Sequence, residues 1–145
     1  MIQHEPLAIR QATEADAAQV RLVVTRALIA LGFDAPDHER DPDLADVRYY
    51  MQPGRGIWVA TLSDGTVVGC AALDRGDGEL ALLRRLAGRG MRALTRSAIA
   101  FAQGRGYRGI ETVLPATMSG AREAVEQEGF APPGRHNDLL LRRAL

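Results

Sequence analysis

The feature that most constrains the fold is the segment ELALLRRLAGRGMRAL, residues 79–94. Its first half is a mostly apolar run, which ends in two closely spaced glycines, and its second half begins a pattern of helical spacing. A mostly apolar run of this length is typical of a strand inside a sheet, and a helix that follows it directly packs back onto that sheet. The segment therefore predicts a strand over 79–86 and a helix that starts at Met91 and is closed by Gly104.

The same patterns extend along the whole chain as alternating strands and helices. Thr13 and Asp16 have the spacing of a helix cap, and SDGT between two apolar runs indicates a β-hairpin. The further predicted strands cover 7–10, 57–62, 67–73, 109–114 and 138–145, and the further predicted helices cover 13–31, 41–51 and 118–129. The order β-α-α-β-β-β-α-β-α-β predicts an α/β protein with one mixed sheet flanked by helices. With 145 residues and no linker-like segment, residues 1–145 are expected to form one domain.

Composition narrows the classes of function. The 18 basic residues are all arginine and balance 18 acidic residues. No apolar run approaches the roughly 18 residues that a membrane span needs, so no membrane partner is expected. The single cysteine, Cys70, cannot form an intrachain disulfide, and no leader is recognisable, which together favour a cytoplasmic protein. No cluster of residues has metal-ligand spacing, and the zero net charge argues against nucleic acid as a partner.

The charges are divided along the chain. Residues 1–79 carry a net charge of −6, and residues 80–145 carry +6. Six acidic residues crowd 34–46, whereas 80–110 holds seven arginines and no acid. We expect the first region to attract a cation and the second an anion.

The junction between the strand 79–86 and the helix at Met91 is the strongest candidate anion site. A helix start leaves about four N–H groups without intrahelical partners, and the helix dipole adds partial positive charge there. Gly88 and Gly90 allow positive φ and close approach to the backbone, and Arg85, Arg89 and Arg92 add charge. A plain tight turn is the alternative interpretation. Of the three GRG tripeptides, only this one stands between a buried strand and a helix.

Together with IRQAT and the following acidic residue near the start, and EAVEQEGF near the end, this segment makes the chain resemble the GCN5-related N-acetyltransferases over roughly residues 8–130. The resemblance implies the acyl-CoA N-acyltransferase fold, with acetyl-CoA as co-substrate. It implies that the strand 79–86 pairs with the thioester arm and that the following loop wraps the pyrophosphate. The cofactor-binding residues expected on this basis are Leu83, Arg84, Arg85, Leu86, Ala87, Gly88, Arg89, Gly90, Met91 and Arg92.

The resemblance also suggests the rest of the active site. Glu79 is the candidate catalytic base, although a surface position at the GDGE turn is the simpler interpretation of this residue. Tyr49, Tyr50 and Trp58, near the acidic segment, are candidate contacts for a cationic amine. They fit equally well as aromatic residues at the edge of a core. The expected partner is a small-molecule amine or amino-acid-like acceptor, and a homodimer is one assembly that we consider.

Two differences from the family pattern favour an alternative function. The link before the glycines is about half a dozen residues shorter than in relatives, and Val125 occupies the position where a tyrosine commonly protonates the leaving thiolate. A thiolate can leave without obligatory protonation, so Val125 predicts slower turnover rather than none. The alternative is a catalytically weak or inactive domain of this fold that binds a ligand or partner.

Overall fold

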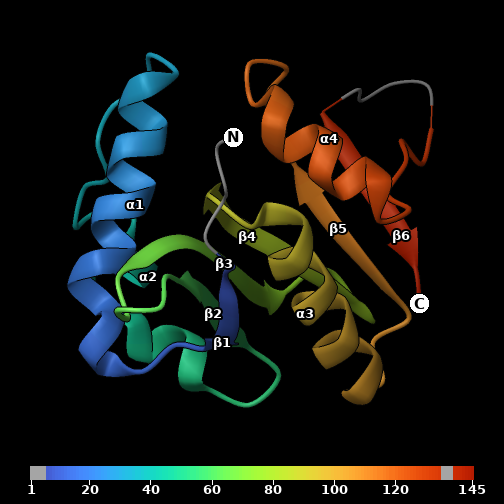
Figure 1. Cartoon of the computed structure of the whole chain (residues 1–145). Coiled ribbons are helices and arrows are strands. Elements are labelled where there is room, and N and C mark those ends of the chain that lie inside the picture. The colour runs from blue at the N-terminus through green and yellow to red at the C-terminus, as the bar shows by residue number, and fades with distance from the viewer. Residues whose placement is uncertain (1–5, 135–138) are drawn as a thin grey trace.

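The computed structural model describes residues 6–134 and 139–145, which form a six-stranded sheet with helices on both faces (Figure 1). The strands are β1 (Ala8–Gln11), β2 (Gly56–Thr61), β3 (Val67–Arg75), β4 (Leu80–Gly88), β5 (Gly109–Val113) and β6 (Leu140–Ala144). The helices are α1 (Ala17–Ala30), α2 (Pro42–Ala45), α3 (Met91–Gly104) and α4 (Ser119–Gln127), with 3-10 turns at Glu14–Asp16 and Val47–Met51. The predicted order of elements and the mixed α/β class are confirmed.

The strands follow one another across the sheet in sequence order, from β1 to β6. All neighbours are antiparallel except β4 and β5, which are parallel because α3 crosses over between them. β4 is longer than predicted, because Gly88 still pairs with Gly69 of β3. The last predicted strand began at Asp138, which lies outside the described residues.

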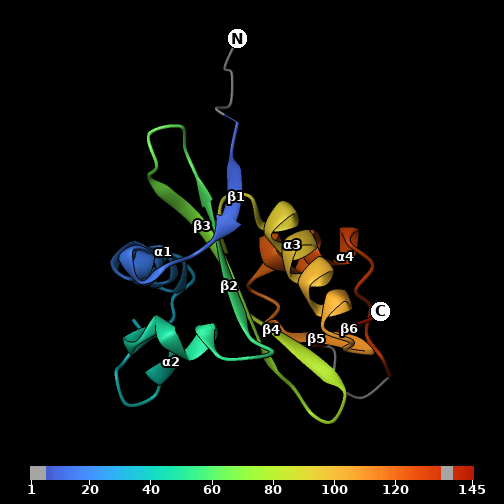
Figure 2. The same ribbon diagram turned by 90° about the horizontal axis from the view of Figure 1, so that it is seen from below.

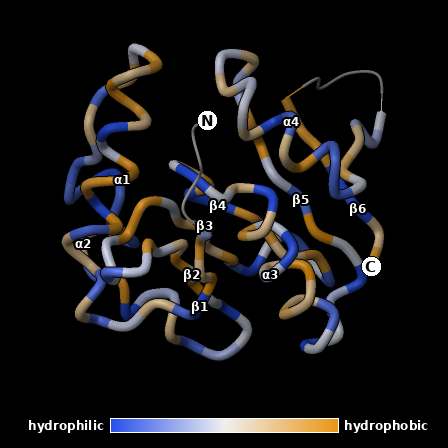
Figure 3. Tube along the Cα trace, in the orientation of Figure 1, coloured by the Kyte–Doolittle hydropathy of each residue, from blue (hydrophilic) through white to orange (hydrophobic). Residues whose placement is uncertain are grey.

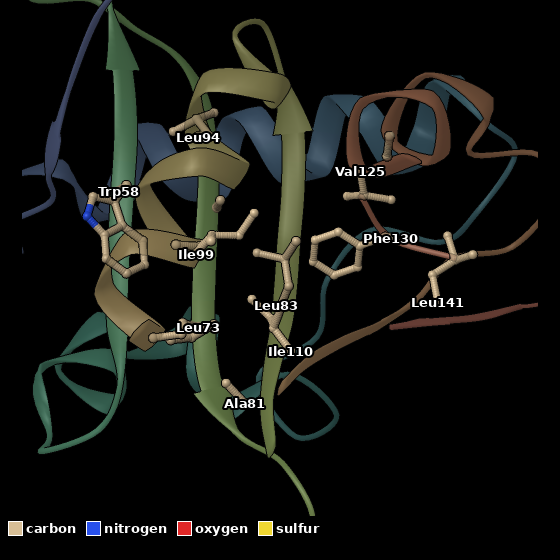
Figure 4. Packing of buried hydrophobic residues seen from close by; sticks show 14 of the residues in the cluster. Trp58, Leu73, Ala81, Leu83, Leu94, Ile99, Ile110, Val125, Phe130 and Leu141 are labelled. Carbon is tan, nitrogen blue, oxygen red and sulfur yellow. The ribbon is translucent and has the colours of Figure 1, made fainter. Parts of the chain in front are cut away.

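The two faces of the sheet have separate cores, and Figure 2 shows the sheet nearly edge-on between them. On the α3/α4 face, buried residues such as Leu83, Leu94 and Val125 form the larger cluster (Figure 4). On the α1/α2 face, residues such as Val20, Leu44 and Tyr50 form the second cluster. Burial of these side chains supplies the main drive for folding, at roughly 25 cal/mol for each Å² of apolar surface.

The helices show the periodicity that the sequence predicted. Leu94, Ala98 and Ala102 of α3 are fully buried, whereas Arg92 and Arg96 on the same helix are exposed. Figure 3 shows this change between hydrophobic and hydrophilic positions along α3 and α4. Within the described ranges, no helix is both long and apolar enough to cross a membrane.

Candidate functional site

The main cleft of the molecule lies where β4 and β5 separate. The two strands pair in parallel only as far as Leu82 and Glu111, and the Thr112 hydroxyl then donates a hydrogen bond to the Leu83 carbonyl at 3.0 Å. Beyond this point the strands diverge (Figure 1). Among the residues that the structure describes, no strand therefore pairs with β4 from Leu83 to Gly88 on the β5 side.

The cleft has a volume of about 520 Å³ and a mostly apolar lining. One wall comes from α1, the other from the segment between β5 and α4, and the β4 edge forms the base. The wall residues are Val24, Ala27 and Leu28 on α1, Leu31 just after it, and Leu114, Pro115, Thr117, Met118, Ser119, Gly120 and Ala121 near the start of α4. Gly88 and Met91 line the end of the cleft nearest α3, so the cleft runs along β4 to the start of that helix.

A β-bulge interrupts β4 in the middle of this edge. Cys70 pairs with Ala87 and Ala72 with Arg84, so two residues of β4 face a single residue of β3. Arg85, at the bulge, has φ of +56° and is the only non-glycine residue with positive φ in the described part of the chain. The Cys70 thiol donates a hydrogen bond to the Arg85 carbonyl at 3.2 Å.

The bulge changes which face each side chain of β4 occupies. Leu83 and Leu86 pack into the α3/α4 core, and Ala87 packs into the α1/α2 core. Arg84 and Arg85 lie between them on the same face, both close to Asp43. A regular strand alternates its side chains, so without the bulge Arg85 would point into the apolar core under α3.

The junction between β4 and α3 is a tight connection through Arg89 and Gly90. A Cβ on Gly69 would lie 1.9 Å from the Arg89 carbonyl oxygen, and one on Gly88 would lie 2.2 Å from the Val68 carbonyl oxygen. These glycines therefore let β3 and the junction approach closely. We had expected Gly88 to make room for an anion, and packing against β3 is the reason that the structure gives.

The start of α3 still offers backbone donors. The first hydrogen bond of the helix runs from the Leu94 N–H to the Gly90 carbonyl at 2.9 Å, which leaves the preceding N–H groups, residues 91–93, for solvent or a ligand. Gly90 has φ of +76° and caps the helix. Of the arginines predicted to add charge here, Arg89 is exposed, whereas Arg92 forms an ion pair with Glu128 at 2.9 Å.

The Arg85 side chain is bound to the acidic segment, residues 34–46, and does not point to the start of α3. Its guanidinium donates to both oxygens of Asp43, at 2.8 and 2.9 Å, and to Asp41 at 2.8 Å. Burial by itself would raise the pKa of the Asp43 carboxyl, but hydrogen bonds from Arg85 and Tyr50 hold that pKa below its ordinary value. The Arg85 side chain is therefore bound within the protein, and we no longer expect it to contact a phosphate.

The acidic segment is linked to the sheet through a second carboxylate, Asp74 of β3. Asp74 accepts hydrogen bonds from the Tyr49 hydroxyl at 2.5 Å, Arg55 at 2.7 Å and Arg84 at 3.2 Å. Burial would raise the pKa of Asp74, and these hydrogen bonds outweigh it and lower the pKa. Asp41, Asp43 and Asp74 thus face three arginines, and the network carries no net charge.

Of the three candidate acceptor residues, Tyr49 and Tyr50 lie together, but Trp58 does not join them. The Tyr50 hydroxyl is buried and donates to Asp43 at 2.5 Å, and Tyr49 meets Tyr50 edge-on. Trp58 lies on the opposite face of the sheet, where its ring packs against Phe101 at 5.3 Å between centroids. Only Tyr49, which is half-buried, remains near the surface of the network.

Glu79 and Val125 also lie away from the cleft. Glu79 precedes β4 at the end opposite the bulge, is largely exposed, and pairs with Arg108 at 3.0 Å. Val125 lies on the buried side of α4, close to Phe130 (Figure 4), and does not line the cleft. No histidine, carboxylate or tyrosine lines the cleft among the described residues.

Sequence reasoning missed two contributions to this site. The α1 wall was not expected, because a run such as LVVTRALIA predicts a buried helix face without saying what it faces. The pairing of Asp41 and Asp43 with Arg85 was also missed, although the opposed charges of the two regions were visible. We had assigned the charges to ligands, and the structure pairs part of them with each other.

Comparison with known proteins identifies the fold. No family model and no curated protein sequence matches the chain. Among solved structures, a GNAT-family acetyltransferase from Staphylococcus aureus Mu50 superposes with a TM-score of 0.81 at 18% identity, covering 97% of this chain and 99% of that one. A GCN5-related N-acetyltransferase from Kribbella flavida gives 0.74 at 22% identity, covering 96% and 98%.

A third structure carries a ligand. A phosphinothricin acetyltransferase of the GNAT superfamily from Sinorhizobium meliloti, solved in complex with AcCoA, matches with a TM-score of 0.74 at 18% identity and covers 96% of this chain and 88% of its own. The chain therefore has the fold of the GCN5-related N-acetyltransferases, as the sequence motifs predicted.

Proposed function

We propose that the protein is an acetyl-CoA-dependent N-acetyltransferase that acts on a small amine or an amino-acid-like acceptor. The observation that carries the proposal is the cleft between β4 and β5, with an unpaired strand edge at its base and unpaired helix N–H groups at its end. The fold, which is shared with acetyltransferase structures, supports the same conclusion.

The residues present fit coenzyme A as a co-substrate. The free edge of β4 from Leu83 to Gly88 is six residues, about 20 Å at roughly 3.3 Å each, and can hydrogen-bond to the two amides of a pantetheine arm. The N–H groups at the start of α3 suit a diphosphate, because the helix dipole and unsatisfied donors coincide there. Acetyl-CoA would supply the thioester, from which a neutral amine displaces the thiolate.

The chain's own contribution to this reaction is positioning and exclusion of water. Backbone N–H groups of β4 near the bulge can stabilise the oxyanion that forms on the acetyl carbonyl. The apolar walls from α1 and α4 keep the thioester away from bulk water. The role of Glu79 as base, predicted from the sequence, is not part of the proposal because that side chain lies outside the cleft. We assign the proton of the amine to solvent.

One observation favours the alternative, a catalytically weak or inactive binding domain. The described cleft residues offer no acid or base beyond the hydroxyls of Thr112, Thr117 and Ser119. General acid–base catalysis contributes typically about 10²- to 10⁴-fold, so a cleft without it turns over slowly. Binding and turnover must therefore be measured separately.

The test is thermal unfolding with acetyl-CoA, with CoA and without ligand, followed by thiol release in the presence of a panel of small amines. Acetyl-CoA at about 100 times its dissociation constant adds about 2.7 kcal/mol, which raises the midpoint by several degrees at this size. No shift with either nucleotide contradicts the proposal. A shift without thiol release supports the binding domain.

A matched pair of variants places the nucleotide. Arg89→Glu reverses a charge at the start of α3 and should reduce the shift produced by CoA. Arg105→Glu makes the same change at the other end of this 14-residue helix, about 20 Å away, and should leave the shift unchanged. Equal effects of the two variants would place the diphosphate elsewhere.

A further inference from the structure

The acidic segment that covers the sheet remains unexplained by the proposed function. Asp41 and Asp43 are too well paired to attract a cationic acceptor, since Arg85 satisfies both at 2.8 Å. The Arg85 side chain is only 15% exposed, and that of Asp43 is 2% exposed. We therefore look for a role of this cluster in the structure of the protein rather than in binding the acceptor.

The position of Arg85 in the backbone suggests what it does. Arg85 occupies the β4 bulge at φ of +56°, a conformation that costs a residue with a Cβ and that glycine adopts readily. A strained residue persists only where its surroundings hold it in place. Here the guanidinium is held by α2 and the segment before it, the carbonyl accepts from Cys70, and Arg85 is one of the residues that line the cleft.

Building on the proposed function, we infer that Arg85 is a positioning residue: its bonds to Asp41 and Asp43 hold the strained bulge, and the bulge sets the backbone of β4 that receives the acyl-CoA. The acidic segment is in this view a part of the cleft's support. Arg85 acts through the backbone, and its side chain makes no contact with the nucleotide.

The decisive experiment compares Arg85→Gly with Arg85→Ala. Both variants lack the guanidinium and remove the same bonds from Asp41 and Asp43, so they differ only by one Cβ. Glycine keeps the bulge without strain, whereas alanine favours a relaxed strand and lowers the population that binds CoA. A residue with a Cβ incurs a free-energy cost in the left-handed conformation that glycine avoids. From this cost we expect Arg85→Gly to bind CoA about 5- to 30-fold more tightly than Arg85→Ala, as measured by titration calorimetry.

Arg84 supplies the matched control. It is the neighbouring arginine, contacts the same network, and has no positive φ. Arg84→Gly should therefore bind CoA no more tightly than Arg84→Ala. Equal CoA affinities of Arg85→Gly and Arg85→Ala, or the same glycine preference at Arg84, would overturn the inference. If the ion pair of Arg85 only stabilises the fold, both Arg85 variants should unfold at a lower temperature and bind CoA with equal affinity.

Two further measurements keep the result decisive. If the Arg85 variants do not fold, the same pair is made in an Asp43→Asn background, which neutralises the buried carboxyl. If the wild-type protein does not bind CoA, the proposed function fails. The inference about the bulge is then tested by thermal unfolding of the two Arg85 variants without ligand. Arg85→Gly should then unfold at a higher temperature than Arg85→Ala, and the opposite order would overturn it.

Discussion

The two faces of the sheet are held to their helices in different ways. The α3/α4 face is apolar, with large aliphatic and aromatic side chains packed between the sheet and two amphipathic helices (Figure 4). The α1/α2 face combines a smaller apolar core with a partly buried network of three aspartates, three arginines and two tyrosines. Helices on one face are held by burial, and on the other partly by ionised groups.

This difference between the two faces explains why the arginines at the β4 bulge lie on the α1/α2 face. The strained bulge of β4 presents two consecutive arginines to one face, and only a face with buried carboxylates can accept them. The apolar face could not accept either cation without a large desolvation cost. The faces should therefore differ in their response to mutation, to pH and to salt.

The largest effect should come from Asp43→Ala on the charged face. The substitution removes the main partner of Arg85 and leaves the buried Tyr50 hydroxyl without its acceptor. Breaking a buried ion pair from one side costs about 3–5 kcal/mol, so the free energy of unfolding at pH 7 should fall by about that amount. Urea unfolding followed by circular dichroism measures it.

Asp46→Ala is the control for this prediction. Asp46 belongs to the same acidic segment, but both it and its partner Arg48 are exposed. Asp46 also caps the turn Val47–Met51, so its loss should lower the unfolding midpoint, but much less than Asp43→Ala does. If the two alanine variants have the same midpoint, the network is not what holds the α1/α2 face.

A smaller effect, which comes mostly from the same face, is expected on mild acidification, although the pKa of Glu128 on the other face is also lowered. The pKa values of Asp41, Asp43 and Asp74 lie below their ordinary value. A hydrogen bond from Arg10 lowers the pKa of Asp16 to about 2. A carboxyl whose pKa is lower in the folded state stabilises the fold above its unfolded pKa, near 3.9, and that contribution is lost as pH falls through the folded pKa. Unfolding free energies measured at pH 7, 5, 4 and 3 should therefore begin to fall near pH 4.

Two variants separate the faces in this experiment. Asp43→Asn removes one titrating group and should flatten the dependence on pH. Leu94→Ala, on the apolar face, should lower the free energy of unfolding by about 2–5 kcal/mol at every pH and leave the slope as it is. A flat profile for the wild type, or a changed slope for Leu94→Ala, would show that the titrating groups lie elsewhere.

The sequence predicts the elements well because they depend on local periodicity. The helix at Met91 and the strand at 79–86 follow from apolar spacing and from glycines, and these signals lie within the segments themselves. The junction between them was also found in this way. The sequence could not show why position 88 is a glycine. In the structure the reason is that β3 approaches the junction closely at Gly69, which leaves no room for a Cβ on Gly88.

The orientation of the site residues could not be predicted, because it depends on pairing between strands. One extra residue in β4 moves Arg85 from one face of the sheet to the other, and no local pattern marks the bulge. The same holds for Trp58, whose face depends on the register of β2 between β1 and β3. The sequence therefore proposes a segment for the candidate site, whereas the partners of its side chains follow only from the fold.

The smallest effect should come from the charges of the apolar face. Glu128 holds Arg92 at 2.9 Å and also pairs with Arg96, but both arginines are at least half exposed. Glu128→Gln keeps the size of the side chain but only one of its two acceptor oxygens. Because both arginines remain open to water, the free energy of unfolding should fall by at most about 1 kcal/mol. Water already solvates these guanidinium groups, in contrast to that of Arg85. The small loss should also disappear in 1 M NaCl, because the Debye length is then about 3 Å, whereas the loss caused by Asp43→Ala should persist. A loss from Glu128→Gln as large as that from Asp43→Ala would mean that both faces depend on buried charge.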